Sequence, residues 1–177
     1  MKQKTSSQSA KAQHLAAPNA LRKTALKAYL LHFFTNVLLA ADAEASLEPY
    51  GLTRLHNRIL VLTAMNPGAT VSDLLRAMRV THQNLNAPMR KLIKDGVLVA
   101  RIGEKDRRQK QLYLTAKGRK LAQAVFSRQL TRLETALAES GPEATDAFLA
   151  VHERLVDRDD LKWAERLAED PSGLATG

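Results

Sequence analysis

The stretch that decides the fold is residues 70–115, which read TVSDLLRAMRVTHQNLNAPMRKLIKDGVLVARIGEKDRRQKQLYLT. Thr81 is a favourable N-cap for a helix, and Val80 before it can pack against Leu85 in the first turn. An apolar stripe then follows at helical spacing, formed by Leu85, Met89, Leu92 and Ile93. The pattern predicts a helix that begins after Thr81 and buries one face.

The opposite face of this helix has no acidic residue. It consists of amides, small residues and cations, namely Gln83, Asn84, Asn86, Ala87, Arg90, Lys91 and Lys94. Amides can bond adenine edges, cations can bond guanine edges or phosphates, and a helix fits the major groove of DNA. A plain solvated face usually includes Asp or Glu, so it is the weaker interpretation. We therefore expect a DNA-reading helix, with Thr81 and His82 of its first turn also at the DNA.

A shorter helix is predicted immediately before the reading helix. Residues 70–73 read TVSD, which is a capping-box start signal, and Leu74, Leu75 and Met78 supply an inner face. Only two residues separate this helix from Thr81. Two short helices that meet across a tight turn are typical of helix-turn-helix modules.

Two strands are predicted after the reading helix. Gly96 is a helix stop, residues 97–102 (VLVARI) are rich in β-formers, and residues 103–110 (GEKDRRQK) are too charged for a core. Residues 111–115 (QLYLT) supply a returning strand, and Thr115 can cap the next helix. Two strands around a cationic tip, directly after a helix-turn-helix, make a winged helix.

These segments together resemble the MarR family of bacterial transcription regulators. The resemblance is carried by Gly51-Leu-Thr53 at a helix start, Leu92-x-x-x-Gly96-Val-Leu-Val, Asp106-Arg-Arg108, and Leu112-x-Leu-Thr-x-x-Gly118. It covers roughly residues 52–118 by motif and the flanking helices by layout.

The resemblance also implies roles in the wing. Arg108 is expected to enter the minor groove from the wing tip, and Asp106 to orient the wing. Lys105 and Arg107 of the same cationic loop are expected to contact DNA as well. An arginine-rich surface turn is the alternative interpretation of this loop.

Pro88 departs from the pattern of the reading helix. A proline inside a helix removes the hydrogen bond to the carbonyl of Asn84 and disfavours helical angles at Ala87, at a cost of about 3 kcal/mol. We therefore expect a kink there, or a loose first turn followed by a regular helix.

The charge is concentrated on the predicted DNA-reading module. The chain has 177 residues, a net charge of +9 and a pI near 10.0. Residues 74–120 carry 13 Lys or Arg against 3 acids, whereas residues 121–177 carry 6 against 11. A DNA-binding protein concentrates basic charge in this way, because the phosphates are met by one surface.

The chain contains no cysteine, which excludes disulfides, thiolate zinc sites and thiol-based redox sensing. No continuous apolar run reaches the length of about 18 residues that a membrane span needs, and residues 1–20 lack the apolar core of a signal peptide. We therefore expect a cytoplasmic protein without a membrane partner.

The expected architecture is mainly α, with one MarR-like domain over residues 18–168 between a disordered basic tail (1–17) and a flexible tail (169–177). Within it, residues 52–118 form a winged helix-turn-helix with a two-strand wing. Residues 18–48 and 119–168 form N- and C-terminal dimerisation helices, because their apolar faces exceed what the module can cover. An enlarged monomeric core is the alternative.

No catalytic residue set is recognised. The sequence has neither a Gly-rich phosphate loop nor a nucleophile elbow, and its five histidines lack metal-ligand spacing. We expect no cofactor and no metal. Residues 157–160 (DRDD) are interpreted as a solvated helix end.

An effector site is expected from the resemblance, because the family usually binds small aromatic or phenolic ligands near the first helix. The candidate residues are Tyr29, His32, Asn36 and Arg54. Their alternative role is as ordinary hydrogen-bonded neighbours of a core.

The function predicted first is a homodimeric, sequence-specific transcription regulator. It is expected to repress from a pseudo-palindromic operator on double-stranded DNA and to be released by a small effector. The second interpretation is a winged-helix protein that binds DNA or RNA architecturally, without operator specificity. An enzyme is disfavoured because no active-site set is recognised.

Overall fold

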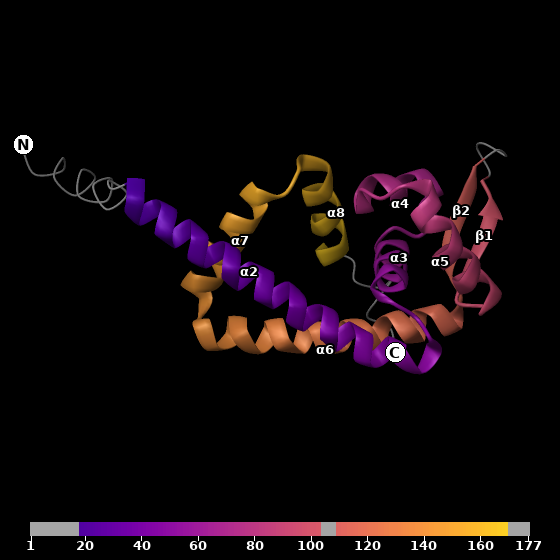
Figure 1. Ribbon diagram of the computed structural model, residues 1–177, viewed down its shortest axis with the longest axis horizontal. Helices are drawn as coiled ribbons and strands as arrows, with labels where there is room; N and C mark the ends of the chain where they lie inside the picture. The colour runs from indigo at the N-terminus through magenta and orange to yellow at the C-terminus, as the bar shows by residue number, and fades with distance from the viewer. Residues whose placement is uncertain (1–17, 104–108, 170–177) are drawn as a thin grey trace, which may run out of the picture. The chain divides into compact units, whose positions relative to one another are not determined.

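The computed structural model of the chain describes residues 18–103 and 109–169 (Figure 1). The element order is α2 (Pro18–Leu47), η1 (Glu48–Tyr50), α3 (Arg54–Met65), α4 (Val71–Met78), α5 (His82–Lys94), β1 (Leu98–Ile102), β2 (Lys110–Leu114), α6 (Ala116–Ser140), α7 (Pro142–Leu155) and α8 (Arg158–Glu169). The predicted fold class, a mainly α winged helix-turn-helix with flanking helices, is confirmed.

The chain divides into two compact units, residues 1–40 and 41–177. In the first unit, the described part of α2 exposes large apolar side chains: Leu21, Leu26, Tyr29, Leu30, Leu31, Phe33, Phe34, Val37 and Leu38. By length and composition alone, residues 19–50 could cross a membrane, with a mean hydropathy of 1.3 in the most apolar window. Polar residues such as Thr35 and Asn36 interrupt the apolar run, but the mean hydropathy of the window is still 1.3.

The second unit holds the hydrophobic core. Buried side chains converge from the end of α2, from α3 to α5, from both strands and from the first half of α6. The largest of them are Leu47, Ile59, Leu60, Leu74, Leu85, Leu92, Val97, Leu98, Leu112 and Val125. This core fixes the helix-turn-helix against the strands.

The wing is a two-stranded antiparallel sheet in which Leu98 pairs with Leu114 and Ile102 with Lys110. The segment before α4 adds to its edge. The Gly68 N–H donates to the Leu112 carbonyl (2.8 Å), and the Leu112 N–H donates to the Ala69 carbonyl (2.9 Å). The wing is therefore bonded to the start of the helix-turn-helix.

The predicted helix caps are present. Thr70 and Asp73 form a reciprocal capping box on α4, with N–H···O distances of 2.9 and 3.2 Å. Thr81 accepts from the Asn84 N–H (3.4 Å), and Thr115 accepts from the Gly118 N–H (3.1 Å). Each side chain satisfies an N–H group that the first helical turn leaves without a partner.

Gly118 lets α6 approach the start of the wing. A Cβ at this position would lie 2.1 Å from the carbonyl oxygen of Val97. The same junction is tied by the Thr115 hydroxyl, which donates to the Gly96 carbonyl (2.6 Å). The glycine of the family pattern is thus required by backbone contact.

Helix α5 differs from the prediction at Ile93, and it spans Pro88 without a break. Ile93, predicted on the buried stripe, is 41% exposed, because the core contacts are taken by Leu85 and Leu92. The helix is also continuous from His82 to Lys94, so Pro88 does not end it. The bend at Pro88 stays a prediction.

The region predicted as C-terminal dimerisation helices (119–168) contains α6, α7 and a separate helix, α8, which follows a break at Val156 and Asp157.

Candidate DNA-binding surface

The reading face of α5 is solvent-exposed in the structure. Its exposed residues are Thr81, His82, Gln83, Asn84, Asn86, Ala87, Arg90 and Lys94. Leu85 and Leu92 on the other side are fully buried, so packing holds the amides and cations outward. The arrangement presents hydrogen-bond donors and acceptors on one continuous helical surface.

Lys91 is placed differently from the other predicted contacts. It is half-buried, and its Nζ pairs with the Asp95 carboxylate at 2.8 Å. This bond holds the pKa of Asp95 below its usual range. The Lys117 ammonium donates to the Asp95 carbonyl (2.9 Å). Lys91 therefore helps to anchor the C-terminal end of α5.

The tip of the wing lies outside the described residues, which include Gly103 and resume at Gln109. The predicted DNA contacts Lys105, Arg107 and Arg108, and the predicted wing-orienting Asp106, lie between these two positions, outside the described residues. At the base of the loop the Gly103 N–H donates to the Gln109 carbonyl (2.9 Å), and the Arg101 guanidinium lies 5.0 Å from the Tyr113 ring centre. Such a distance allows a cation–π contact.

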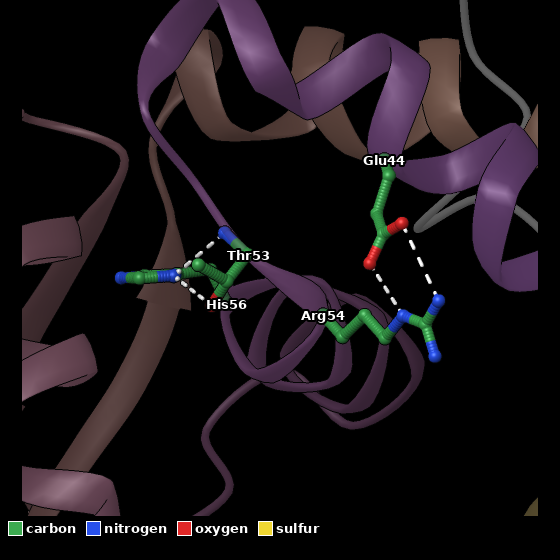
Figure 2. Close-up of polar contacts among 4 residues, drawn as sticks. All are labelled: Glu44, Thr53, Arg54 and His56. Atoms are coloured by element: carbon green, nitrogen blue, oxygen red, sulfur yellow. Dashed lines mark hydrogen bonds and ion pairs between the residues drawn. The ribbon is translucent and has the colours of Figure 1, made fainter.

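Behind the reading helix, a buried histidine caps α3 (Figure 2). The Nδ1 atom of His56 accepts from the Thr53 N–H at 3.0 Å and lies 2.9 Å from the Thr53 hydroxyl oxygen. Burial is the main cause that lowers the pKa of His56, and the positive charge of Lys91 adds to it. The neutral ring suits the cap, since Nδ1 must keep its lone pair.

The predicted effector residues are divided between the two units. In the first unit, Asn36 Nδ2 lies 2.9 Å from His32 Nε2, one turn along α2. Tyr29 belongs to the same unit and has an exposed ring. In the second unit, two nitrogens of the Arg54 guanidinium donate hydrogen bonds to the Glu44 carboxylate (Figure 2). These bonds raise the pKa of Arg54.

A groove of about 480 Å³ lies elsewhere in the second unit, between α3, α4 and α6. Its lining includes Asn57, Arg58, Met78 and Phe126. The Asn57 side-chain oxygen is buried without a hydrogen-bond partner in the part of the chain that the structure describes. Sequence reasoning missed this groove, because its walls come from three separate helices.

Within residues 18–103 and 109–169, the structure contains no group of three His, Asp or Glu side chains that could hold a metal ion. The segment 157–160 instead makes ion pairs with Arg79, in the turn between α4 and α5. The sequence predicted a basic module and an acidic C-terminal region, but it did not predict a contact between them.

Comparison with known proteins gives a consistent result. A family model described as the MarR family matches residues 50–109. The HTH-type transcriptional regulator PetP of Rhodobacter capsulatus is 34% identical over 125 residues, which cover 71% of this chain and 75% of that protein.

Solved structures also match. A MarR family regulator from Silicibacter pomeroyi has a TM-score of 0.62 at 20% identity and covers 72% of this chain and 86% of that chain. The Mycobacterium tuberculosis MarR family protein Rv2887, in complex with p-aminosalicylic acid, has a TM-score of 0.52 at 27% identity. Its match covers 72% of this chain and 96% of that one.

Proposed function

The chain belongs to the MarR family of transcription regulators, and from this premise we propose that it represses transcription as a homodimer on a pseudo-palindromic operator. A small aromatic or phenolic effector releases it from the DNA. Its relatives are transcription regulators and not enzymes. A cytoplasmic location follows from the proposal, because the operator DNA lies there.

The observation that carries the proposal is the exposed face of α5, which holds amides, a small residue and cations but no carboxylate. A protein that binds only phosphates needs cations alone, whereas amides can report base identity. The face therefore favours sequence-specific reading over architectural binding.

The homodimer is supported by the apolar side chains that the two units leave exposed. In the first unit these lie on α2 and include Leu30, Phe33 and Phe34; in the second unit they lie on α7 and include Leu149 and Val151. Soluble monomers rarely expose apolar surface of this extent. A two-fold axis would place the two reading helices about one DNA turn apart.

Light scattering at micromolar concentration tests the dimer. We expect about twice the chain mass of 19.5 kDa. A particle of the chain mass would contradict the proposal. Co-sedimentation with lipid vesicles provides the second measurement, because α2 is long and apolar enough for a membrane. Vesicle binding in place of dimer formation would assign that surface to lipid.

Selection of bound duplexes from a random-sequence pool tests the operator. A pseudo-palindromic consensus is expected. Binding without any sequence preference would instead support the architectural interpretation.

Two arginines sharpen this test. Arg108→Ala should weaken binding to most duplexes, because an arginine in a narrow minor groove meets enhanced negative potential. Arg90→Ala should change the selected sequence if Arg90 bonds a guanine edge, and should weaken all duplexes alike if it bonds phosphate. Parent-like affinity of Arg108→Ala at 0.15 M salt would refute the wing assignment.

The effector proposal draws on Rv2887, which was solved with p-aminosalicylic acid. Two positions in the second unit are compared: Arg54, which the sequence predicted, and the groove beside Arg58. Titration calorimetry should detect salicylate binding by the parent chain. Arg54→Ala and Arg58→Ala are then compared, and the variant that binds salicylate more weakly identifies the site. No binding by the parent chain would remove this ligand class.

A further inference from the structure

The acidic start of α8 contacts the turn of the helix-turn-helix. Arg79 lies in this turn, between the end of α4 and the Thr81 cap of α5. Its guanidinium bonds the carboxylate of Asp157 and lies 3.6 Å from that of Asp160. Arg79 and Asp157 are 78 positions apart in the sequence, so the contact is a tertiary one.

The backbone at Arg79 supports a role for its side chain. Arg79 has a φ of 53°, which makes it the one non-glycine residue with positive φ in the described ranges. Glycine or asparagine adopts this left-handed conformation at lower energy. An arginine here carries a conformational cost that the turn itself does not require.

The contact lies beside the end of α5 that enters DNA. In helix-turn-helix proteins the first residues of the reading helix contact the bases, and the preceding helix crosses the phosphate backbone. Arg79 is two residues before the N-cap of α5, so its guanidinium is close to the expected path of a phosphate strand. Carboxylates at the same place would repel those phosphates.

We propose that the start of α8 is an autoinhibitory contact, in which Asp157 and Asp160 occupy Arg79 until a DNA phosphate replaces them. The inference rests on the proposed function for the position of the DNA. It assigns Arg79 as a phosphate contact, and it implies that the carboxylates at the start of α8 weaken DNA binding.

The geometry favours a contact that can exchange. The side chains of Arg79 and Asp157 are 70% and 74% exposed. Ion pairs this exposed contribute little to stability and are screened by salt. Their removal should therefore change DNA affinity by about three-fold without unfolding the protein.

The test compares two double variants of the full-length protein. Asp157→Asn/Asp160→Asn removes the carboxylates on Arg79, and asparagine at 157 can still cap α8. Asp159→Asn/Glu165→Gln removes the same charge from the same helix, and in the described structure neither carboxylate pairs with Arg79. Light scattering confirms that both keep the oligomeric state of the parent.

Affinity is measured by fluorescence anisotropy on a random-sequence duplex at 50 mM salt. A phosphate contact does not depend on base sequence, so no operator is needed. Asp157→Asn/Asp160→Asn should bind about three-fold more tightly than the control pair. Asparagine suits the left-handed backbone at position 79. When Arg79→Asn is added to both double variants, the difference between them should disappear. Arg79→Asn alone should reduce the slope of log K against log salt by about 0.9 relative to the parent.

Equal affinities for the two double variants would overturn the inference, as would a difference that persists with Arg79→Asn. Neither result affects operator selection, so each leaves the proposed function standing. If the parent binds this duplex but selects no operator, the proposed function fails and the comparison of variants still applies. If no protein binds duplex DNA at 50 mM salt, both proposals fail.

Discussion

The winged core (residues 52–125) buries most of its large apolar side chains, whereas the flanking helices (residues 18–40 of α2, and α7) expose theirs. In the winged core, Leu74, Leu85 and Leu112 are completely buried by their own chain. On the flanking helices, Phe34 and Leu155 are 57% and 73% exposed. The difference indicates that the winged core is stabilised within one chain, whereas the described part of the chain leaves these helical faces uncovered; the proposed dimer would cover them.

The largest contrast is expected from one substitution made in each region. Gly118→Ala places a methyl group 2.1 Å from the Val97 carbonyl oxygen, so α6 and the wing must separate. We expect a loss of about 3 kcal/mol or more in the free energy of unfolding. Gly141→Ala, before α7, meets no atom within 4 Å but has a φ of +80°. With a ψ of 169° the backbone lies in a region that essentially only glycine adopts, so the cost should be about 1–3 kcal/mol.

Urea titration measures both free energies of unfolding. Equal costs at the two glycines would show that the close approach at Val97 is relieved by a small backbone shift.

The second contrast uses protein concentration. Leu74→Ala leaves a cavity in the winged core and should lower the free energy of unfolding by about 2–5 kcal/mol at every concentration. Phe34→Ala should instead lower the melting temperature by an amount that depends on concentration, because it weakens the proposed interface between chains. Thermal unfolding at 1 and 100 μM separates the two. A concentration-independent loss from Phe34→Ala would place its cover within the same chain.

The third contrast concerns proline. Pro88 lies inside α5, where it removes a hydrogen bond, so Pro88→Ala should raise the free energy of unfolding by about 1 kcal/mol or more. Pro142 is at the first turn of α7, where proline is favourable. Pro142→Ala should be neutral or slightly destabilising.

Operator selection with Pro88→Ala then tests the expected bend. A changed preference would show that the bend sets how Gln83, Asn84 and Asn86 reach the bases. If both stability and preference stay at the parent values, the proline has no role in recognition.

The smallest contrast is in the pH dependence of stability. His56 in the winged core has a folded pKa below its usual 6.5, mainly because of burial. Its contribution to the free energy of unfolding is therefore complete above pH 6.5, and it declines as the pH falls from there through the pKa of the folded state. Asp42 of α2 has a pKa below 3.8 because Arg132 bonds its carboxylate, so its contribution declines only in stronger acid.

His56→Gln keeps a side chain that can cap α3, and it should flatten the decline in unfolding free energy between pH 7 and 5. Asp42→Asn should leave this range unchanged and alter the profile below about pH 4. A parent-like slope in His56→Gln would exclude the histidine as the group that titrates.

Local patterns were sufficient to predict most of the fold. The caps at Thr70, Thr81 and Thr115, the stop at Gly96 and the two strands were all recognisable, because each depends on residues within a few positions of one another. The outward face of α5 followed from helical periodicity, and the structure exposes it as predicted.

Tertiary structure alone decided the rest. It turned Lys91 toward Asp95, exposed Ile93, paired Arg54 with Glu44 and brought Asp157 to Arg79. Counting charges along the sequence predicted a basic module and an acidic C-terminal region, but not that they touch. Which side chains meet depends on how the helices pack, and that packing is set by the buried core between residues far apart in the chain.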